Sequence, residues 1–208
     1  MSVYRVLEVL KKDGEARLTP DYLCESLGLP RREAGTILRR LHQHGLIRRV
    51  ASGLYYNDLG MPEPPNELVF HDWMARASYV SFSTAMHLHG IIDQIPYVVT
   101  CARWDGPSVK VENDFGRYWY TRIPRSLAFG FDRIKWARVA LPEKALLDQI
   151  WIHIHDGCKP RTEELYLQGI MDPGRFLDFA ERMGLLEYVT EVGLADPSRW
   201  PEFEPQIV

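Results

Sequence analysis

The chain has 208 residues, of which 46% are hydrophobic and 25% are charged, and its formal net charge is −3 at pH 7. This length and composition are ordinary for a globular protein of one or two domains, and no apolar run is long enough for a membrane helix. Residues 1–12 alternate charged and apolar side chains, which is not the pattern of a signal peptide. The three cysteines are scattered and odd in number, which argues against a disulfide framework, so we expect a cytoplasmic protein.

The charge is distributed unevenly along the chain. Residues 1–60 carry ten Lys/Arg and seven Asp/Glu, which gives +3, whereas the remaining residues carry 15 and 21, which gives −6. A basic first part on an acidic second part indicates that only the first part meets nucleic acid.

The first 30 residues predict two helices. The first has a single apolar face, formed by Val3, Val6, Leu7 and Leu10. Thr19 precedes Pro20, a pair typical of an N-cap followed by the first residue of a helix. Gly28-Leu29-Pro30 is expected to end this second helix and to turn the chain.

A third helix is expected from Arg31 to about His44, with Gly45 as a left-handed residue at its end. Its apolar face consists of Ala34, Ile37, Leu38 and Leu41. Its opposite face is polar and basic, and consists of Arg31, Arg32, Thr36, Arg39, Arg40 and Gln43. A tight turn followed by an arginine-rich helix is the order of a helix-turn-helix, whose second helix enters the major groove of DNA.

The segment after the third helix predicts a short hairpin, with strands over 46–50 and 54–56 and a turn between them. From Arg31 to Ser52 the chain has six arginines and one acidic residue, a local charge of +5. Arginine binds guanine edges and phosphates with a planar fork, which lysine cannot do, so the use of arginine alone indicates groove recognition rather than simple solubility. We therefore predict a winged helix-turn-helix that contacts double-stranded DNA through Arg31, Arg32, Thr36, Arg39, Arg40, Gln43, Arg48, Arg49 and Ser52. The alternative is a protein-docking winged helix, which predicts no salt-sensitive affinity for DNA.

A proline-rich segment, residues 61–65, is expected to link a domain over 1–60 to a second domain over 66–208. The second domain is predicted to be α+β, with a small mixed or antiparallel sheet packed by helices. The expected strands are 97–102, 108–112, 117–123 and 134–140. The expected helices are 67–77, a short helix capped by Ser81 or Ser83, 142–154, 162–168, 173–182 and 185–192.

Three segments of the chain resemble AbiEi-type antitoxins. They are the small-residue segment Tyr79–Gly90, the sequence PEKALLD at Pro142–Asp148, and the wing at Leu46–Tyr56. Each motif is short, but their order and spacing are fairly specific, and the resemblance covers roughly Val3 to Val192. It implies a type IV toxin–antitoxin system linked to phage defence by abortive infection.

The resemblance implies two roles. The winged helix would repress the shared operon by binding inverted repeats in its promoter, through the arginines and the threonine of the third helix and the two arginines of the wing. The second domain would neutralise a nucleotidyltransferase-like toxin, directly or functionally. A free-standing winged-helix regulator is the alternative. A further alternative is a DNA-acting enzyme with a nuclease-like second domain, which would cleave or modify DNA when divalent metal is added.

Other chemistry in the sequence is discounted. Glu143, Lys144 and Asp148 are the best catalytic-looking cluster, but the i,i+4 spacing of Lys144 and Asp148 is that of a surface ion pair. A structural role is favoured, in which Asp148 hydrogen-bonds a neighbouring loop. The string from His153 to Cys158 has zinc-ligand residue types in a spacing that fits no common site. No glycine-rich phosphate loop follows a strand, and we expect no metal, no cofactor and no catalytic residue.

Overall fold

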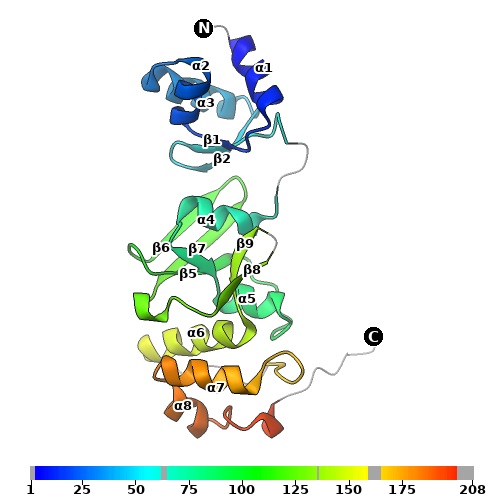
Figure 1. The fold of residues 1–208 in the computed structure, drawn as a ribbon, viewed down its shortest axis with the longest axis vertical. Coiled ribbons are helices and arrows are strands. Elements are labelled where there is room, and N and C mark those ends of the chain that lie inside the picture. The colour runs from blue at the N-terminus through cyan, green and yellow to red at the C-terminus, as the bar shows by residue number, and fades with distance from the viewer. Residues whose placement is uncertain (1–2, 62–64, 135, 159–164, 201–208) are drawn as a thin grey trace. The chain divides into compact units, whose positions relative to one another are not determined.

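The computed structural model describes residues 3–61, 65–134, 136–158 and 165–200 (Figure 1). The chain forms two compact units. Unit 1 comprises Met1–Met74 together with Glu112–Gly116, and unit 2 comprises Ala75–Val111 and Arg117–Val208. A short segment from the middle of the chain therefore belongs to the N-terminal unit. The predicted linker lies mostly outside the described residues, and the separation of 1–60 from 66–208 stays a prediction.

Unit 1 contains the predicted winged helix-turn-helix. Its elements are α1 (Val3–Asp13), β1 (Arg17–Leu18), α2 (Pro20–Leu27), α3 (Arg31–Gln43), β2 (Arg48–Ala51), β3 (Leu54–Tyr56), a 3-10 turn (Glu67–Val69) and α4 (Phe70–Met74). The three helices and the hairpin lie where the sequence predicts them. Strand β1 was not predicted, because two residues carry no periodicity. It pairs antiparallel with β3, which gives the sheet order β1-β3-β2.

The caps that the sequence predicts are present. Thr19 precedes α2 and its hydroxyl oxygen accepts a hydrogen bond from the Tyr22 N–H at 3.2 Å. Gly28 ends α2 with φ +66°, and Gly45 follows α3 with φ +69°. Both values lie in the left-handed region that glycine adopts without steric cost, so these two glycines set the turns on either side of α3.

The core of unit 1 joins the three helices to the wing. Its buried residues are Val6, Leu10, Leu18, Leu23, Leu29, Ala34, Ile37, Leu38, Leu41, Ile47 and Tyr55. All four apolar residues predicted for α3 belong to it. Because α3 buries this stripe, its basic face is turned away from the core.

A second cluster in unit 1 consists of aromatic rings. Tyr56 is fully buried and meets Phe70 and Phe115 edge-on, with centroids 5.8 and 5.6 Å apart. Phe70 and Phe115 stack on each other at 3.8 Å. Trp73 adds edge-on contact to Phe70 at 5.2 Å. Aromatic clusters of this kind bury large areas, so α4 and residue 115 stabilise the wing that precedes them in the chain.

Unit 2 has the predicted α+β architecture. Its strands are β4 (Ser78–Val80), β5 (Val99–Arg103), β6 (Val109–Asn113), β7 (Gly116–Arg122), β8 (Phe131–Ile134) and β9 (Ala137–Ala140). Its helices are α5 (Phe82–Leu88), α6 (Pro142–His155), α7 (Pro173–Arg182) and α8 (Leu186–Glu191), with 3-10 turns at Arg125–Leu127 and Pro197–Arg199. The sheet is mixed and has the order β6-β7-β5-β4-β9-β8. The ends of β6 and β7 that meet at their turn belong to unit 1.

The strand register explains why the sheet is mixed. β5 pairs antiparallel with β4 and parallel with β7, so Cys101 lies opposite Val80 on one side and Tyr120 on the other. β4 pairs parallel with β9, and β9 pairs antiparallel with β8. The strand predicted over 134–140 is confirmed at residues 137–140, which form β9, whereas Ile134 ends β8, a strand that the sequence did not predict and that pairs antiparallel with β9.

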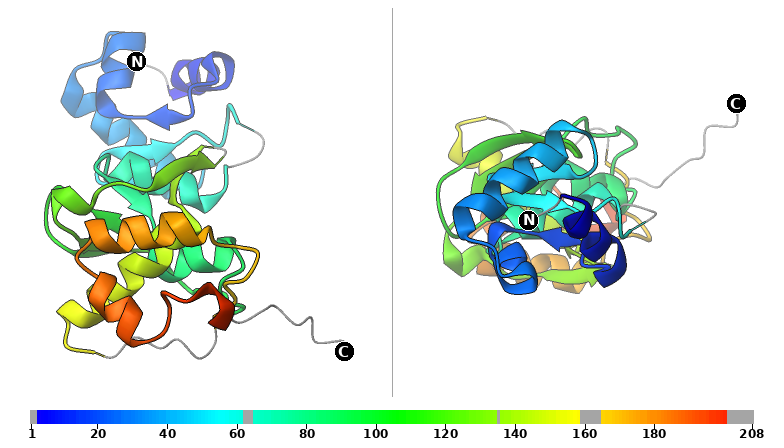
Figure 2. Two further views of the ribbon diagram at one scale, coloured as in Figure 1. Left: turned by 60° about the horizontal axis from the view of Figure 1, so that its bottom comes forward. Right: turned by 90° about the horizontal axis from the view of Figure 1, so that it is seen from above.

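The helices of unit 2 lie in successive layers. α5 packs against β5, α6 packs against α5, α7 against α6 and α8 against α7. The ribbon views agree that α6 and α7 lie side by side (Figures 1 and 2). Because α6 is covered from several sides, all residues from Glu143 to Asp148 are buried.

Two predicted helices and one predicted cap differ in the structure. The helix expected over 67–77 is a 3-10 turn followed by the short α4. The helix expected over 162–168 lies partly outside the described residues, and residues 165–167 are not helical. Ser81 is the residue before α5, as predicted, but its hydroxyl makes no cap and instead donates to Asp148.

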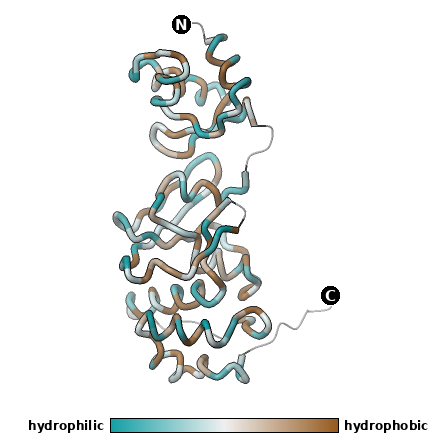
Figure 3. Tube along the Cα trace, viewed as in Figure 1, coloured by the Kyte–Doolittle hydropathy of each residue, from teal (hydrophilic) through white to brown (hydrophobic). Residues whose placement is uncertain are grey.

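Hydrophobic segments are short in both units and alternate with hydrophilic ones (Figure 3). Within the described residues, no helix has the length and apolar content that crossing a membrane requires.

Candidate nucleic-acid interface

The exposed face of α3 carries most of the predicted DNA-contacting residues. Arg32, Arg39, Arg40 and Gln43 are exposed, and Thr36 is half-buried with its hydroxyl donating to the Arg32 carbonyl at 2.9 Å. Within the described part of the chain, the guanidinium groups of Arg32, Arg39 and Arg40 form no hydrogen bond or ion pair. These three groups are therefore available to an anionic partner.

Arg31 differs from these arginines although it lies on the same helix. Its guanidinium forms an ion pair with Asp21 of α2, and both side chains are more than half exposed. Exposed pairs of this kind are worth at most about 1 kcal/mol, so this contact is readily exchanged for a phosphate.

The wing presents a small polar tip. Ser52 and Gly53 are exposed at the turn between β2 and β3, where Gly53 has φ +69°. Arg49 is exposed, and its Nε donates to the Ala51 carbonyl at 3.4 Å, so its side chain follows the strand toward the turn. The register shifts between Arg49 and Ala51, which bends β2 at this point.

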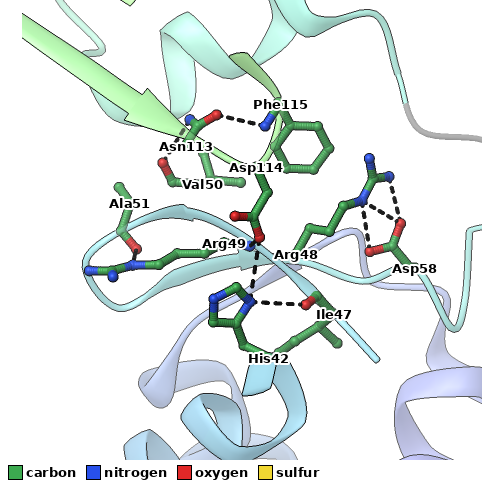
Figure 4. Close-up of polar contacts among 10 residues, drawn as sticks. All are labelled: His42, Ile47, Arg48, Arg49, Val50, Ala51, Asp58, Asn113, Asp114 and Phe115. Carbon is green, nitrogen blue, oxygen red and sulfur yellow. Dashed lines mark hydrogen bonds and ion pairs between the residues drawn. The ribbon is translucent and has the colours of Figure 1, made fainter. Parts of the chain in front are cut away.

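Arg48 is bound within unit 1. Its Nε and one terminal nitrogen donate to the Asp58 carboxylate at 2.9 and 2.6 Å (Figure 4). Its guanidinium also lies over the ring of Phe115, 4.3 Å from the centroid, and over Tyr56 at 5.5 Å. A two-pronged ion pair on an aromatic ring holds the side chain in one orientation. Arg48 is therefore held by contacts within unit 1, and its predicted contact with DNA stays a prediction.

The comparison with protein families identifies this part of the chain. A family model described as MarR family matches residues 1–54. The N-terminal domain is a MarR-family winged-helix DNA-binding domain. No curated protein matches the chain. The MarR match covers the helix-turn-helix and most of the wing, and it does not reach the motifs in unit 2 that resemble AbiEi-type antitoxins.

The sequence did not indicate that Asn113, Asp114 and Phe115 meet the MarR-type domain. These residues form the turn between β6 and β7 and contact β2, α3 and the aromatic cluster (Figure 4). The only local signal is a turn composition, and a turn does not reveal what it packs against.

The catalytic-looking cluster of unit 2 is buried. Lys144 is 0% and Asp148 1% exposed, so the expected surface ion pair is wrong. The Lys144 ammonium donates to one Asp148 oxygen and to the Tyr79 hydroxyl, which is 3.0 Å away. Tyr79 and Ser81 each donate to the other Asp148 oxygen, at 2.8 and 2.7 Å. The structural role expected for Asp148 is thus present, since its partners lie on β4 and just before α5.

Burial shifts the ionisation of this cluster in both directions. Burial lowers the pKa of Lys144, and the neighbouring Asp148 carboxylate opposes that change. Burial, together with the Asp148 charge, raises the pKa of Tyr79 well above its ordinary value. Both directions follow from the cost of charge in a medium of low dielectric constant.

Tyr79→Phe should therefore have a pH-dependent effect on stability. An unfolded tyrosine ionises near pH 10, whereas folded Tyr79 stays protonated to higher pH, so its stabilising contribution is complete below about pH 10 and declines above it. We expect a cost of about 1–3 kcal/mol at neutral pH, decreasing by up to about 1.4 kcal/mol per pH unit above pH 10. Urea denaturation at several pH values measures this, with Tyr97→Phe, at a side chain that is 96% exposed, as the control. A cost independent of pH up to the alkaline limit would contradict the assignment.

The zinc-type residues do not converge within the described part of the chain, where no three His, Cys, Asp or Glu side chains are placed to hold a metal. His153 bonds Gln149 through Nε2 at 3.1 Å, and His155 stacks on Trp151 at 5.0 Å. Both histidines therefore interact along the helix that carries them.

Proposed function

We propose that this protein is a transcriptional repressor that reads double-stranded operator DNA with α3 and holds the backbone with its wing. The observation that carries the proposal is the exposed row of Arg32, Arg39 and Arg40, on a helix that the MarR-type core fixes from behind. Arginine on the outer face of a recognition helix suits guanine edges and phosphates. Inverted repeats are the proposed operator, each half read by one copy of the domain.

The roles within the interface differ by position. We assign base reading to Arg39, in the middle of the exposed face, and phosphate contact to Arg49 and Ser52 on the wing. We propose that Arg48 does not contact DNA, because it would have to give up its charge-assisted hydrogen bonds to Asp58.

Arg39→Ala should weaken binding by about 1–3 kcal/mol and relax the preference at one base position, whereas Arg49→Ala should weaken binding to all sequences alike. Mobility-shift titrations measure this, using a duplex that the wild-type protein enriches from a random-sequence pool and a scrambled version of it. Equal losses on both duplexes for Arg39→Ala would refute its role in base reading. Failure to enrich any duplex would refute the proposed function as a whole.

A second proposal is that unit 2 is the antitoxin of a nucleotidyltransferase-like toxin. It is supported by the PEKALLD sequence, which forms the buried first half of α6, and by the acidic balance of residues 61–208. The test is co-expression from a foreign promoter with the product of an adjacent nucleotidyltransferase-like gene. Protection of the cells supports the antitoxin role, and absence of protection by folded protein leaves a free-standing regulator.

We propose a binding rather than a catalytic role for unit 2. Glu143, Lys144 and Asp148 are each at most 1% exposed, so a substrate has no access to them. Incubating the protein and DNA with a divalent metal tests this proposal, since cleavage or modification of the DNA would contradict it.

A further inference from the structure

The outer edge of the wing is covered by the turn of the β6–β7 hairpin, residues Glu112–Gly116, here called the hairpin tip. In the order β1-β3-β2, strand β2 is an edge strand with unpaired backbone groups. The tip supplies partners for them. The Arg49 N–H donates to the Asp114 carboxylate at 2.7 Å, and the Asp114 N–H donates to the Arg49 carbonyl at 3.3 Å. The Asn113 side-chain amide donates to the Val50 carbonyl at 2.9 Å.

The same carboxylate also reaches the recognition helix. The Asp114 oxygen that accepts from Arg49 lies 3.4 Å from Nδ1 of His42, in the last turn of α3 (Figure 4). This nitrogen is also 3.3 Å from the carbonyl oxygen of Ile47, in the segment that leads into β2. One acidic side chain therefore joins the end of α3 to the start of the wing, the two parts that must act together on DNA.

Phe115 fixes the tip in this place. Its ring stacks on Phe70, meets Tyr56 edge-on and lies under the Arg48 guanidinium. Its N–H donates to the side-chain oxygen of Asn113 at 2.8 Å, which closes the turn. Contacts to strand, helix and aromatic cluster together make the tip an integral part of unit 1, although both of its strands continue into unit 2.

We infer that the hairpin tip positions the DNA-reading elements, and that Asp114 is a positioning residue that sets α3 and the wing relative to each other without touching DNA. The inference rests on the proposed DNA-binding function and deepens it.

Asp114→Ala discriminates this inference from simple electrostatics by the sign of its effect. An acidic group beside Arg49 repels phosphate, so electrostatics alone predicts that its removal tightens DNA binding. Loss of positioning predicts the opposite, a dissociation constant for the enriched duplex that is about 5- to 30-fold higher. Asp132→Ala, which removes an exposed acid on β8, controls for the change in net charge. Asp114→Asn should fall between the wild type and Asp114→Ala, because an amide oxygen still accepts from the Arg49 N–H.

Hydrogen–deuterium exchange tests the contact without DNA. The Arg49 amide should exchange faster in Asp114→Ala than in the wild type, and remain protected in Asp132→Ala. Weaker DNA binding together with faster exchange supports the inference. Tighter or unchanged DNA binding, or unchanged exchange at Arg49, overturns it. If the wild type enriches no duplex, the proposed function fails while the exchange result still decides whether Asp114 holds the wing.

Discussion

Asp148→Ala is expected to lower the free energy of unfolding of unit 2 by about 3–5 kcal/mol. The substitution leaves the Lys144 ammonium inside the protein with no opposite charge, and it removes the acceptor of the Tyr79 and Ser81 hydroxyls. Breaking a buried pair costs more than the pair contributes, because the remaining charge stays desolvated. Urea denaturation followed by tryptophan fluorescence measures the change, since five of the six tryptophans lie in unit 2.

Two further variants separate the charge from the packing. Lys144→Met/Asp148→Leu removes both charges and should regain most of the lost stability, since apolar replacement of a buried ion pair is often neutral or stabilising. Asp178→Ala, at an exposed acid on α7, should change stability by no more than about 0.5 kcal/mol. If Asp148→Ala were as mild as Asp178→Ala, the buried network would not hold β4, α5 and α6 together.

The local part of the fold was predictable because its signals are local. Helices α2, α3 and α7 begin and end close to where caps, prolines and glycines place them, and the buried stripe of α3 follows from spacing alone. The predicted strand began too early, at Ile134 instead of at the start of β9, because the run from Ile134 to Ala140 contains no glycine or proline to mark where one strand ends and the next begins. Strand order and register depend on pairing between distant segments, which periodicity does not encode.

The candidate site could likewise be predicted only where its signals are local in the sequence. The exposed arginines of α3 were predictable, because burying one face of a helix exposes the other. The contact between the Arg48 guanidinium and the Phe115 ring was not predictable, because Phe115 lies in a turn that is distant in the sequence. Lys144 and Asp148 show the same limit, since i,i+4 spacing describes an ion pair equally well in solvent and in the interior. Burial is decided by β4, α5 and α7, which pack around α6 from elsewhere in the chain.

Charge reversal on α3 should have the largest effect on DNA binding. Arg39→Glu/Arg40→Glu replaces two exposed cations by anions on the face of α3 that we propose contacts DNA, so we expect binding to weaken by about 100-fold or more. The dependence of binding on salt should also become shallower, because fewer counterions are released from the phosphates. Because both side chains are exposed and form no ion pair within the described residues, the circular dichroism spectrum and the melting temperature should stay close to those of the wild type.

The matched control is Lys11→Glu/Lys12→Glu, which makes the same change in net charge at two exposed residues near the end of α1. General electrostatic attraction to DNA falls equally in both double variants, so the difference between them isolates the contribution of the α3 face. We expect the α1 variant to lose about 10-fold or less. Equal losses in the two variants would show that the basic charge of unit 1 acts only as a diffuse field and that α3 does not enter the groove. A much larger loss for the α3 variant, with its fold intact, locates recognition on the face that carries Arg39 and Arg40.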